Sequence, residues 1–524
     1  MGSYQGSACP ATPLLYSITT NLSMEQFELI AKTFQGLEEV LAQELTELGA
    51  DEIQIGRRMV SFTGNKEMMY RANFCLRTAV RILKPIKHFT ASDANDVYTA
   101  VRAIDWSQYL DLNTTFAVDS VVYSTEFRHS KFVAYKVKDA IVDYFRETTG
   151  ERPNIRISKP DIQLNIHIAE DQCTLSLDSS GESLHLRGYR TGQGEAPINE
   201  VLAAGLIKLT GWQCDTDFID PFCGSGTILV EAALMARNIY PGVFRKHFGF
   251  EKWKDFDAEL LESIYNDDSE EREFTHHIYG YDLNLRAVEI ARDNAKSAGV
   301  SDIISVEQRD IANFVKPAEK ALMVTNPPYG ERITSPDLLG LYRTFGRVLK
   351  HDFTGGEAWV ISYKEECFAN MGLKPSFKVP LFNGSLDCEF RKYQLFDGKL
   401  DAFRAAGGDV KTNEERRRMA ESGRFKKRRD EFKGRNAEGD ATEREKPDFT
   451  ALDEEQIQAY KILRRKHSEF ELRNGRGEKR NGRGEKRNGR NDHRNGRPNR
   501  DEKSFKGGRT GRYDRNRRND HRDD

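Results

Sequence analysis

Hydrophobic runs alternate with amphipathic stretches along the chain from Thr210 onward. Short apolar runs end near Asp220, Asp282 and Val324, and the stretches that follow the first two place apolar residues at the three- and four-residue spacing of a helix. Strands that alternate with helices are typical of a parallel sheet with helical crossovers. We therefore predict an α/β fold with a parallel sheet in this part of the chain.

The N-terminal region shows a second α/β pattern. A helix is predicted over residues 34–48, and two short strands follow it at 50–55 and 59–62. Further along, basic residues gather around the predicted start of another helix. Such a cluster is either an ordinary solvated helix face or a set of contacts to nucleic-acid phosphates. Its members are Arg128, His129, Lys131, Lys136 and Lys138.

The first strand-to-helix turn of the parallel sheet carries the sequence DPFCGSGT. Gly224 and Gly226 let the backbone approach a ligand closely, and the free N–H groups of the following helix favour an anionic group. The spacing matches neither GxGxxG nor the GxxxxGK[ST] phosphate loop, so a carboxylate-bearing ligand fits better than a triphosphate. The turn comprises Asp220, Pro221, Cys223, Gly224, Ser225, Gly226 and Thr227.

Acidic residues follow the next two predicted strands. Asp282 ends the second strand, where a carboxylate of a doubly wound fold can accept hydrogen bonds from both hydroxyls of a ribose. Asp310 follows the third strand and is placed to accept from an adenine amino group. Each aspartate alone also fits a turn or cap residue. Together with the glycine turn, the ordered set indicates a nucleoside site.

A rigid turn ends the fourth predicted strand, in the stretch VTNPPYGERI at residues 324–333. Pro327 and Pro328 can neither donate to a β-ladder nor continue a helix, so the strand must stop abruptly. With Asn326 and Tyr329 they form a turn that points polar groups into a crevice. Beyond it, Arg332 contacts either a base edge or phosphate, or an acidic neighbour on the surface.

Composition limits the class of protein. The 524 residues suffice for two or three domains, and no uninterrupted apolar stretch reaches the length of about 18 residues needed to span a bilayer. Seven cysteines form no CxxC pair, which argues against a zinc ribbon and a dense disulfide framework and indicates a reducing cytoplasm. We expect no metal. Residues 1–24 lack the basic start of a secretory signal, and we expect a disordered leader.

Charge is distributed unevenly along the chain. The net charge is only -2, but residues 461–524 carry 23 Lys and Arg against 11 Asp and Glu. Within them RNGRGEK at 473–479 repeats at 480–486. Such a segment cannot bury enough apolar surface to fold, so we predict a charged, largely disordered tail over 401–524. This tail either increases solubility or makes non-specific contacts with RNA phosphates. We favour RNA contacts, because the rest of the chain is acidic and would otherwise repel RNA.

The motifs DPFCGSGT, GYDLN, RD and TNPPYG, in this order, resemble those of class I S-adenosylmethionine-dependent methyltransferases that act on amino groups. LHLRGYRTGQGEAPINEVLAAGLIKLTGW and FRKHFGFEKW are similar to stretches of the bacterial THUMP-containing 23S rRNA guanine-N2 methyltransferases. KTFQGLEEVLAQELTELGA resembles their ferredoxin-like element, and FRHSKFVAYKVKDAIVDYF resembles part of their THUMP domain. Two features depart from the family: Asn199 stands where a lysine is common, and the basic tail replaces a second methyltransferase domain of the long forms.

The resemblance implies a domain order. After the leader, a ferredoxin-like element is expected over 25–85 and an RNA-binding THUMP domain over 86–188. A Rossmann-like class I methyltransferase domain is expected over 189–400, before the tail. The family implies S-adenosylmethionine as the cofactor and ribosomal RNA as the partner of a cytoplasmic monomer. The alternatives are a tRNA guanine-N2 methyltransferase, a methyltransferase for a release-factor glutamine and a non-catalytic assembly factor, and a THUMP-like region favours RNA over a protein substrate.

The resemblance also implies roles for residues. An exocyclic amine is a poor nucleophile because its lone pair is delocalised into the ring, so the site must hold the NH2 group and aim its lone pair at the methyl group. The implied catalytic residues are Asn326, Pro327, Pro328 and Tyr329, whose ring would stack on the flipped base. The implied cofactor contacts are Asp220, Pro221, Cys223, Gly224, Ser225, Gly226, Thr227, Asp282, Asp310 and Asn326. The implied RNA contacts are Arg128, His129, Lys131, Lys136, Arg187, Arg190 and Arg332.

Overall fold

The computed structural model describes residues 25–127, 129–192, 194, 197–330, 337–396 and 398. The predicted leader over 1–24 and tail over 401–524 lie outside the described residues. Within these ranges, no helix has the length and apolar character needed to cross a bilayer. The described residues also contain no group of three His, Cys, Asp or Glu side chains that could hold a metal ion.

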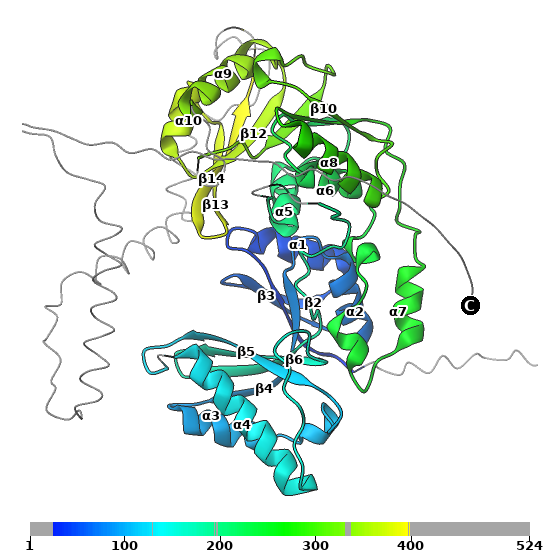
Figure 1. Cartoon of the computed structure of the whole chain (residues 1–524), viewed down its shortest axis with the longest axis vertical. Coiled ribbons are helices and arrows are strands. Elements are labelled where there is room, and N and C mark those ends of the chain that lie inside the picture. Colours follow the sequence, from blue (N-terminus) through cyan, green and yellow to red (C-terminus); the bar gives the residue numbers. More distant parts are fainter. Residues whose placement is uncertain are drawn as a thin grey trace, which may run out of the picture. The chain divides into compact units, whose positions relative to one another are not determined.

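Seven strands form the first sheet, in the order β2-β3-β1-β4-β7-β6-β5 (Figure 1). Strand β4 pairs with β1 and with β7, so the two domains predicted over 25–85 and 86–188 share one continuous sheet. Because β4 runs from Arg81 to Thr90, it crosses the predicted boundary between residues 85 and 86. The other strands are β1 (Phe27–Lys32), β2 (Asp51–Gly56), β3 (Met59–Gly64), β5 (Phe116–Tyr123), β6 (Ile162–Ala169) and β7 (Gln172–Asp178).

In the described part of the chain, four α-helices and one short 3-10 helix lie between these strands in sequence. The helix predicted over 34–48 begins only at Glu38, because Gly36 adopts a left-handed conformation with φ of +94° and donates its N–H to the Glu38 carboxylate at 2.7 Å. Buried side chains of α1, α2, α3 and α4 join those of the strands in one core. The helices are α1 (Glu38–Leu48), α2 (Lys66–Cys75), α3 (Ala94–Arg102), η1 (Trp106–Gln108) and α4 (Ser130–Thr149).

The second sheet also has seven strands, in the order β10-β9-β8-β11-β12-β14-β13. Its first five strands pair in parallel, whereas β14 pairs antiparallel with both β12 and β13. The predicted parallel α/β sheet is therefore confirmed, with an antiparallel hairpin added at one edge. The strands are β8 (Asp217–Asp220), β9 (Ile278–Asp282), β10 (Ile304–Gln308), β11 (Ala321–Thr325), β12 (Glu357–Ser362), β13 (Phe377–Asn383) and β14 (Leu386–Gln394).

Helices cover both faces of the second sheet. Residues of α5, α6 and α8 form one core with Phe218, Ile278 and Val324, while α9 and α10 form another with residues of the opposite strand face, such as Ile219 and Met323. Alternate residues of a strand thus enter different cores. The helices are α5 (Glu200–Thr210), α6 (Thr227–Ala236), α8 (Leu285–Ser297), η4 (Ile311–Asn313), α9 (Leu338–His351) and α10 (Glu365–Met371).

The stretch FRKHFGFEKW follows a helix of the second sheet and packs into the core of the first sheet. It follows α6 and is part of a segment that contains η2 (Pro241–Phe244), η3 (Gly249–Lys252) and α7 (Ala258–Tyr265). Its Phe250 ring stacks on Tyr70 of α2 with the ring centroids 4.0 Å apart, and Trp253 is buried in the same core. This stretch therefore stabilises the packing of the segment that follows α6 on the core of the first sheet.

Candidate active site

Four predicted site residues lie at the carboxyl ends of neighbouring parallel strands. Asp220 ends β8, Asp282 ends β9, Asp310 follows β10 and Asn326 follows β11. These strands are consecutive in the sheet order β10-β9-β8-β11, and the carboxyl ends of parallel strands face the same edge. The structure therefore brings together the acidic residues and the amide that the sequence separates by more than 100 positions.

The glycine turn between β8 and α6 is tied to the end of β9. Gly224 donates its N–H to the Asp282 carboxylate at 3.0 Å, and Cys223 donates to the Tyr281 carbonyl at 2.9 Å. Gly224 has φ of +53°, and a Cβ placed on it would meet no atom within 4 Å, so the backbone there faces open space. Gly226 has φ of +79°, and its Cβ would lie 2.9 Å from the Ala291 Cβ. One glycine exposes the backbone and the other lets the turn pack on α8.

Asn294 of α8 is a buried residue that the sequence reasoning missed. Its amide donates to the Ser225 carbonyl at 2.9 Å, and its side-chain oxygen accepts from the Thr191 N–H at 2.9 Å. The side chain is only 1% exposed. It therefore ties the glycine turn to the segment before α5. Its position could have indicated this role, because Asn294 falls on the same helix face as the apolar residues Val288, Ala291 and Ala295.

Asp282 and Asp310 also act as local turn residues. Asp282 accepts a hydrogen bond from the Asn284 N–H at 2.8 Å, besides the one from the glycine turn. Asp310 is exposed and accepts from the Ala312 N–H at 2.8 Å, which caps η4. Each carboxylate oxygen can accept more than one hydrogen bond, so capping is compatible with ligand binding.

Asn326 presents an acceptor that has no hydrogen-bond partner in the described part of the chain. Its side-chain oxygen is buried and makes no hydrogen bond with any described residue. A buried polar atom of this kind is costly to leave unsatisfied, so it marks a place where a ligand donor is expected. The adjoining Pro327 is buried and Pro328 is half-buried, which makes this end of β11 rigid.

Tyr329 is held from two sides. Its hydroxyl accepts a hydrogen bond from the Asn383 amide at 2.6 Å, at the end of β13. Its ring meets the Tyr363 ring edge to face, with centroids 5.4 Å apart and an interplanar angle of 80°. Tyr363 directly follows β12. The ring that the sequence assigns to base stacking therefore has a defined orientation.

Asp220 is buried beneath the site. It is 1% exposed, and its carboxylate accepts from the Thr325 hydroxyl at 2.6 Å and from the Phe222 N–H at 3.1 Å. Burial raises the pKa of Asp220 to about 7, the two hydrogen bonds oppose this rise, and the negative charge of Asp282 adds to it. Asp220 therefore links the end of β8 to the end of β11 beneath the glycine turn, and its contact with the cofactor stays a prediction.

The raised pKa of Asp220 predicts a pH dependence of stability. The folded chain keeps a proton on this carboxyl up to about pH 7, whereas the unfolded chain releases it near the ordinary value of 3.8. The resulting stabilisation is full below pH 3.8 and is lost as the pH rises through 7, by up to about 1.4 kcal/mol per pH unit. We expect the melting temperature of the wild type to fall more between pH 5 and 8 than that of Asp220→Asn. If the melting temperatures of the two proteins fell equally, the raised pKa of Asp220 would be contradicted.

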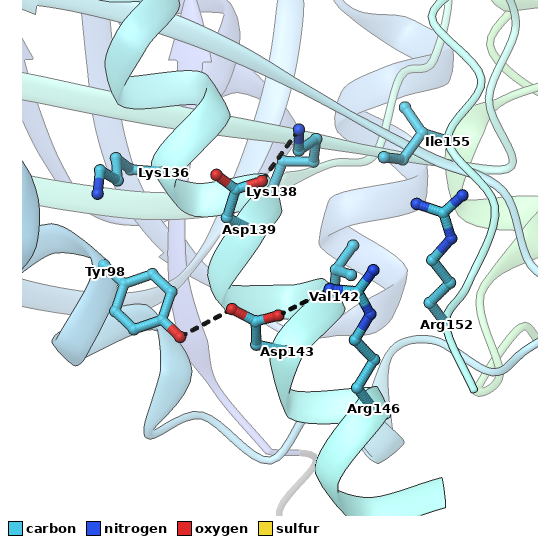
Figure 2. A pocket seen from close by; sticks show the side chains of 9 residues that line it. All are labelled: Tyr98, Lys136, Lys138, Asp139, Val142, Asp143, Arg146, Arg152 and Ile155. Atoms are coloured by element: carbon cyan, nitrogen blue, oxygen red, sulfur yellow. Dashed lines mark hydrogen bonds and ion pairs between the residues drawn. The ribbon is translucent and has the colours of Figure 1, made fainter. Parts of the chain in front are cut away.

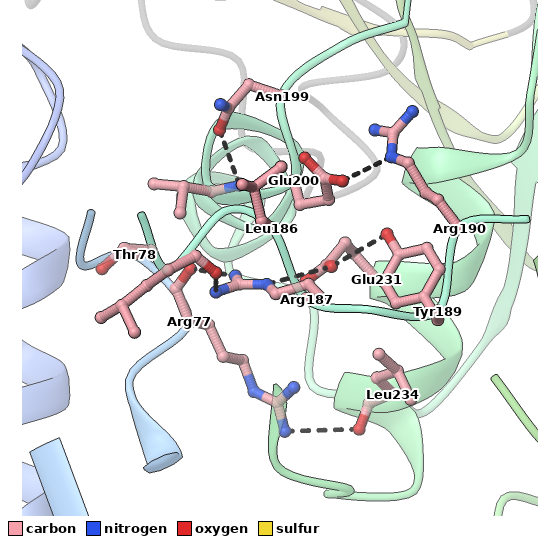
Figure 3. Close-up of polar contacts among 12 residues, drawn as sticks. Arg77, Thr78, Leu186, Arg187, Tyr189, Arg190, Asn199, Glu200, Glu231 and Leu234 are labelled. Atoms are coloured by element: carbon pink, nitrogen blue, oxygen red, sulfur yellow. Dashed lines mark hydrogen bonds and ion pairs between the residues drawn. The ribbon is translucent and has the colours of Figure 1, made fainter. Parts of the chain in front are cut away.

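The burial of Arg187 contradicts its predicted RNA contact. The residue is 2% exposed, and its guanidinium donates to the Arg77 and Leu184 carbonyls and lies 3.5 Å from the Glu231 carboxylate (Figure 3). Tyr189 donates its hydroxyl to the same carboxylate at 3.1 Å. The guanidinium contacts protein groups inside the fold and is not available to RNA. Arg187 therefore holds the segment before α5 in place.

Arg190 is also largely enclosed. Its guanidinium forms an ion pair with Glu200 (Figure 3). It also donates to the Ile198 carbonyl at 2.7 Å. Asn199 lies between these partners and caps α5, because its side-chain oxygen accepts from the Val201 N–H at 2.9 Å. The asparagine that replaces the common lysine therefore has a structural role in this chain.

A polar cavity lies along the exposed side of α4. It has a volume of about 310 Å³ and is lined by the basic residues Lys136, Lys138, Arg146 and Arg152 together with two aspartates (Figure 2). His129 directly precedes α4, and Lys131 is exposed in its first turn. Two other residues of the predicted RNA-binding set, Arg128 and Arg332, lie outside the described residues.

Comparison with protein families gives three matches in the order of the fold. Residues 28–83 match the RlmL ferredoxin-like domain, residues 91–178 match the THUMP domain, and residues 187–392 match the RMKL-like methyltransferase domain. The predicted domain types and their order are therefore confirmed.

Three solved structures resemble most of the chain. The structure described as SMU.472 complexed with SAH is 31% identical, covers 72% of this chain and 100% of its own, and has a TM-score of 0.64. A "possible methylase" from Clostridium difficile 630 is 32% identical over 72% and 100% of the two chains, with a TM-score of 0.65. A predicted N6-adenine-specific DNA methylase from Listeria monocytogenes str. 4b F2365 is 32% identical over 71% and 97%, with a TM-score of 0.64. The chain therefore belongs to the family of THUMP-containing, S-adenosylmethionine-dependent 23S rRNA methyltransferases.

Proposed function

We propose that the chain methylates the exocyclic N2 amine of a guanine in 23S ribosomal RNA. The observation that carries this proposal is the buried side-chain oxygen of Asn326 at the carboxyl end of β11, which has no hydrogen-bond partner among the described residues. An oxygen of this kind can accept a hydrogen bond from an amino group of a base. A ring carbon offers no comparable hydrogen-bond donor, so this oxygen could not hold it in place. Methylation of a ring carbon would instead call for a nucleophilic residue such as cysteine.

The neighbouring strand ends fit S-adenosylmethionine. Gly224 leaves open space beside its backbone, which suits close approach of the cofactor's amino-acid portion. Asp282 and Asp310 present carboxylate oxygens for the ribose hydroxyls and the adenine amino group. When bound, the cofactor supplies a methyl group activated by the adjacent sulfonium. The chain's own residues must therefore present the target nitrogen to it.

The turn after β11 holds and orients the amine. Asn326 Oδ1 and the Pro327 carbonyl are the two acceptors that we assign to the NH2 group. Hydrogen bonds to both N–H groups localise the nitrogen lone pair and aim it along one direction. The nitrogen gains positive charge as its new bond forms, and the same oxygens stabilise that charge until one proton leaves to solvent. Tyr329 stacks on the base and fixes its plane.

The exposed side of α4 supports RNA as the substrate. Phe132 and Tyr135 are 52% and 57% exposed, and Lys136 and Lys138 lie within 5.7 Å and 5.3 Å of their ring centroids. Aromatic rings beside cations are typical of surfaces that bind unpaired bases and the adjoining phosphates. The basic cavity continues this surface along the same helix (Figure 2). A protein substrate would have no need of this combination.

Mass spectrometry of RNA nucleosides tests the proposal. Ribosomal and transfer RNA from a strain that lacks this protein are incubated with the purified chain and S-adenosylmethionine, and the nucleosides are then separated. We expect N2-methylguanosine to appear in 23S rRNA. Methylation confined to tRNA would favour the tRNA alternative, N6-methyladenosine would overturn the base assignment, and no methylation of either RNA would reject the proposed substrate.

The Asp282 carboxylate provides a prediction about cofactor affinity. Asp282→Ala removes the ribose acceptor and also the anchor of the Gly224 N–H, so we expect cofactor binding to weaken by about 1–3 kcal/mol. Calorimetric titration with S-adenosylhomocysteine measures the change. Asp293→Ala on the exposed side of α8 is the matched control and should bind like the wild type. Unchanged affinity in Asp282→Ala would contradict the assignment.

A further inference from the structure

The hydrogen bond between Asn383 and Tyr329 reaches the catalytic turn from a distant part of the chain. The Asn383 amide donates to the Tyr329 hydroxyl at 2.6 Å, although the two residues are 54 positions apart. Tyr363 contacts the same ring edge to face. We infer that Asn383 is a positioning residue for methyl transfer, because its hydrogen bond sets the plane of the ring that receives the target base. This inference rests on the proposed function.

The backbone of Asn383 is itself fixed by the β13–β14 hairpin. Asn383 is the last residue of β13 and lies opposite Leu386, with a turn between them in which Gly384 has φ of +65°. Pairing in register on β14 determines which way each β13 side chain points. The amide is thus presented from a paired strand end rather than from a free loop, which suits a group whose task is orientation.

The same strand touches the N-terminal part of the chain. A Cβ on Gly36 would lie 2.6 Å from Leu381 Cδ2 and 2.8 Å from the Pro380 carbonyl oxygen, so the Gly36 backbone lies directly against β13. The next residue, Leu37, is fully buried in a core of the methyltransferase domain. The position of Asn383 therefore depends on contacts with the ferredoxin-like element as well as on its own hairpin.

A double-mutant cycle on the methyl-transfer rate tests this role. Asn383→Ala removes the amide, and Tyr329→Phe removes the hydroxyl while keeping the ring. We expect each change to lower kcat by about two- to tenfold, the effect of one neutral hydrogen bond, without changing the affinity for S-adenosylhomocysteine. In the double variant we expect kcat to be lowered as much as in either single variant, because both changes break the same hydrogen bond between Asn383 and Tyr329. Asn370→Ala is the matched control, because this amide donates to the Glu366 carbonyl of its own helix at 2.9 Å.

Independent effects that multiply in the double variant would overturn the inference, as would an unchanged kcat in Asn383→Ala. A purely structural role for Asn383 predicts such multiplication, together with a lower melting temperature. If Asn383→Ala fails to fold, Tyr329→Phe tests the same hydrogen bond from its other end, and an unchanged kcat there overturns the inference. The wild type is measured in the same assay. Absence of its activity on 23S rRNA rejects the proposed function, whereas an active wild type without coupling rejects only the role of Asn383.

Discussion

Asn326→Ala is expected to lower the methyl-transfer rate by about a hundredfold or more, as loss of a positioned hydrogen-bond group does in other enzymes. The side-chain oxygen has no hydrogen-bond partner among the described residues, so its removal breaks no hydrogen bond with them. The lower rate should therefore appear in the methyl-transfer step, in which positive charge develops on the target nitrogen. Cofactor affinity should stay nearly unchanged, because the glycine turn and Asp282 are intact.

Single-turnover kinetics with saturating RNA isolates this step from RNA binding and product release. Calorimetric titration with S-adenosylhomocysteine supplies the independent readout. Asn326→Asp keeps an acceptor at the same place and should retain more activity than Asn326→Ala, which separates the acceptor role from mere volume. If the rate and the cofactor affinity fell in parallel, Asn326 would belong to the cofactor site and the assignment to the target amine would be wrong.

The strand-end residues could be predicted from the sequence because their positions follow from local patterns. An apolar run predicts a buried strand, and the polar residue that follows it must then lie at the sheet edge. The same reasoning applied to Asp220, Asp282, Asp310 and Asn326 places all four at one edge, where the structure has them. The order of the strands was not needed, since all parallel strands of the sheet end on the same side.

Other features could not be predicted, because they depend on contacts between distant segments. Arg187 resembles a surface cation in the sequence, and only the packing of Glu231 and the Arg77 carbonyl around it shows that it is buried. Asn383 belongs to an edge hairpin with no catalytic motif of its own. The spacing along the chain carries no information about such pairs. A charge count is likewise a poor guide to which arginines are exposed.

The buried charges around Glu231 should dominate the stability of the methyltransferase domain. Glu231 of α6 is fully buried, accepts a hydrogen bond from Tyr189 and lies beside Arg187 (Figure 3). Arg77 is buried nearby, and its guanidinium donates to the Ile239 carbonyl at 2.9 Å. Burial raises the pKa of Glu231, and the charges of Arg187 and Arg77 oppose this rise. The carboxylate thus balances two cations that are almost fully buried.

Glu231→Ala is therefore expected to destabilise the protein by about 3–5 kcal/mol, the range for leaving a buried charge without its partner. For a domain of this size the melting temperature should fall by roughly 6–20 °C. Glu307→Ala is the control: its exposed ion pair with Arg309 should contribute less than about 1 kcal/mol. The double variant Glu231→Leu with Arg187→Met removes a charge of each sign, so it should melt above Glu231→Ala. Two results would show that the carboxylate is not the counter-charge of the buried arginines. One is a melting temperature of Glu231→Ala equal to that of Glu307→Ala. The other is a loss of stability in the double variant that equals the sum of the losses caused by Glu231→Leu and by Arg187→Met alone.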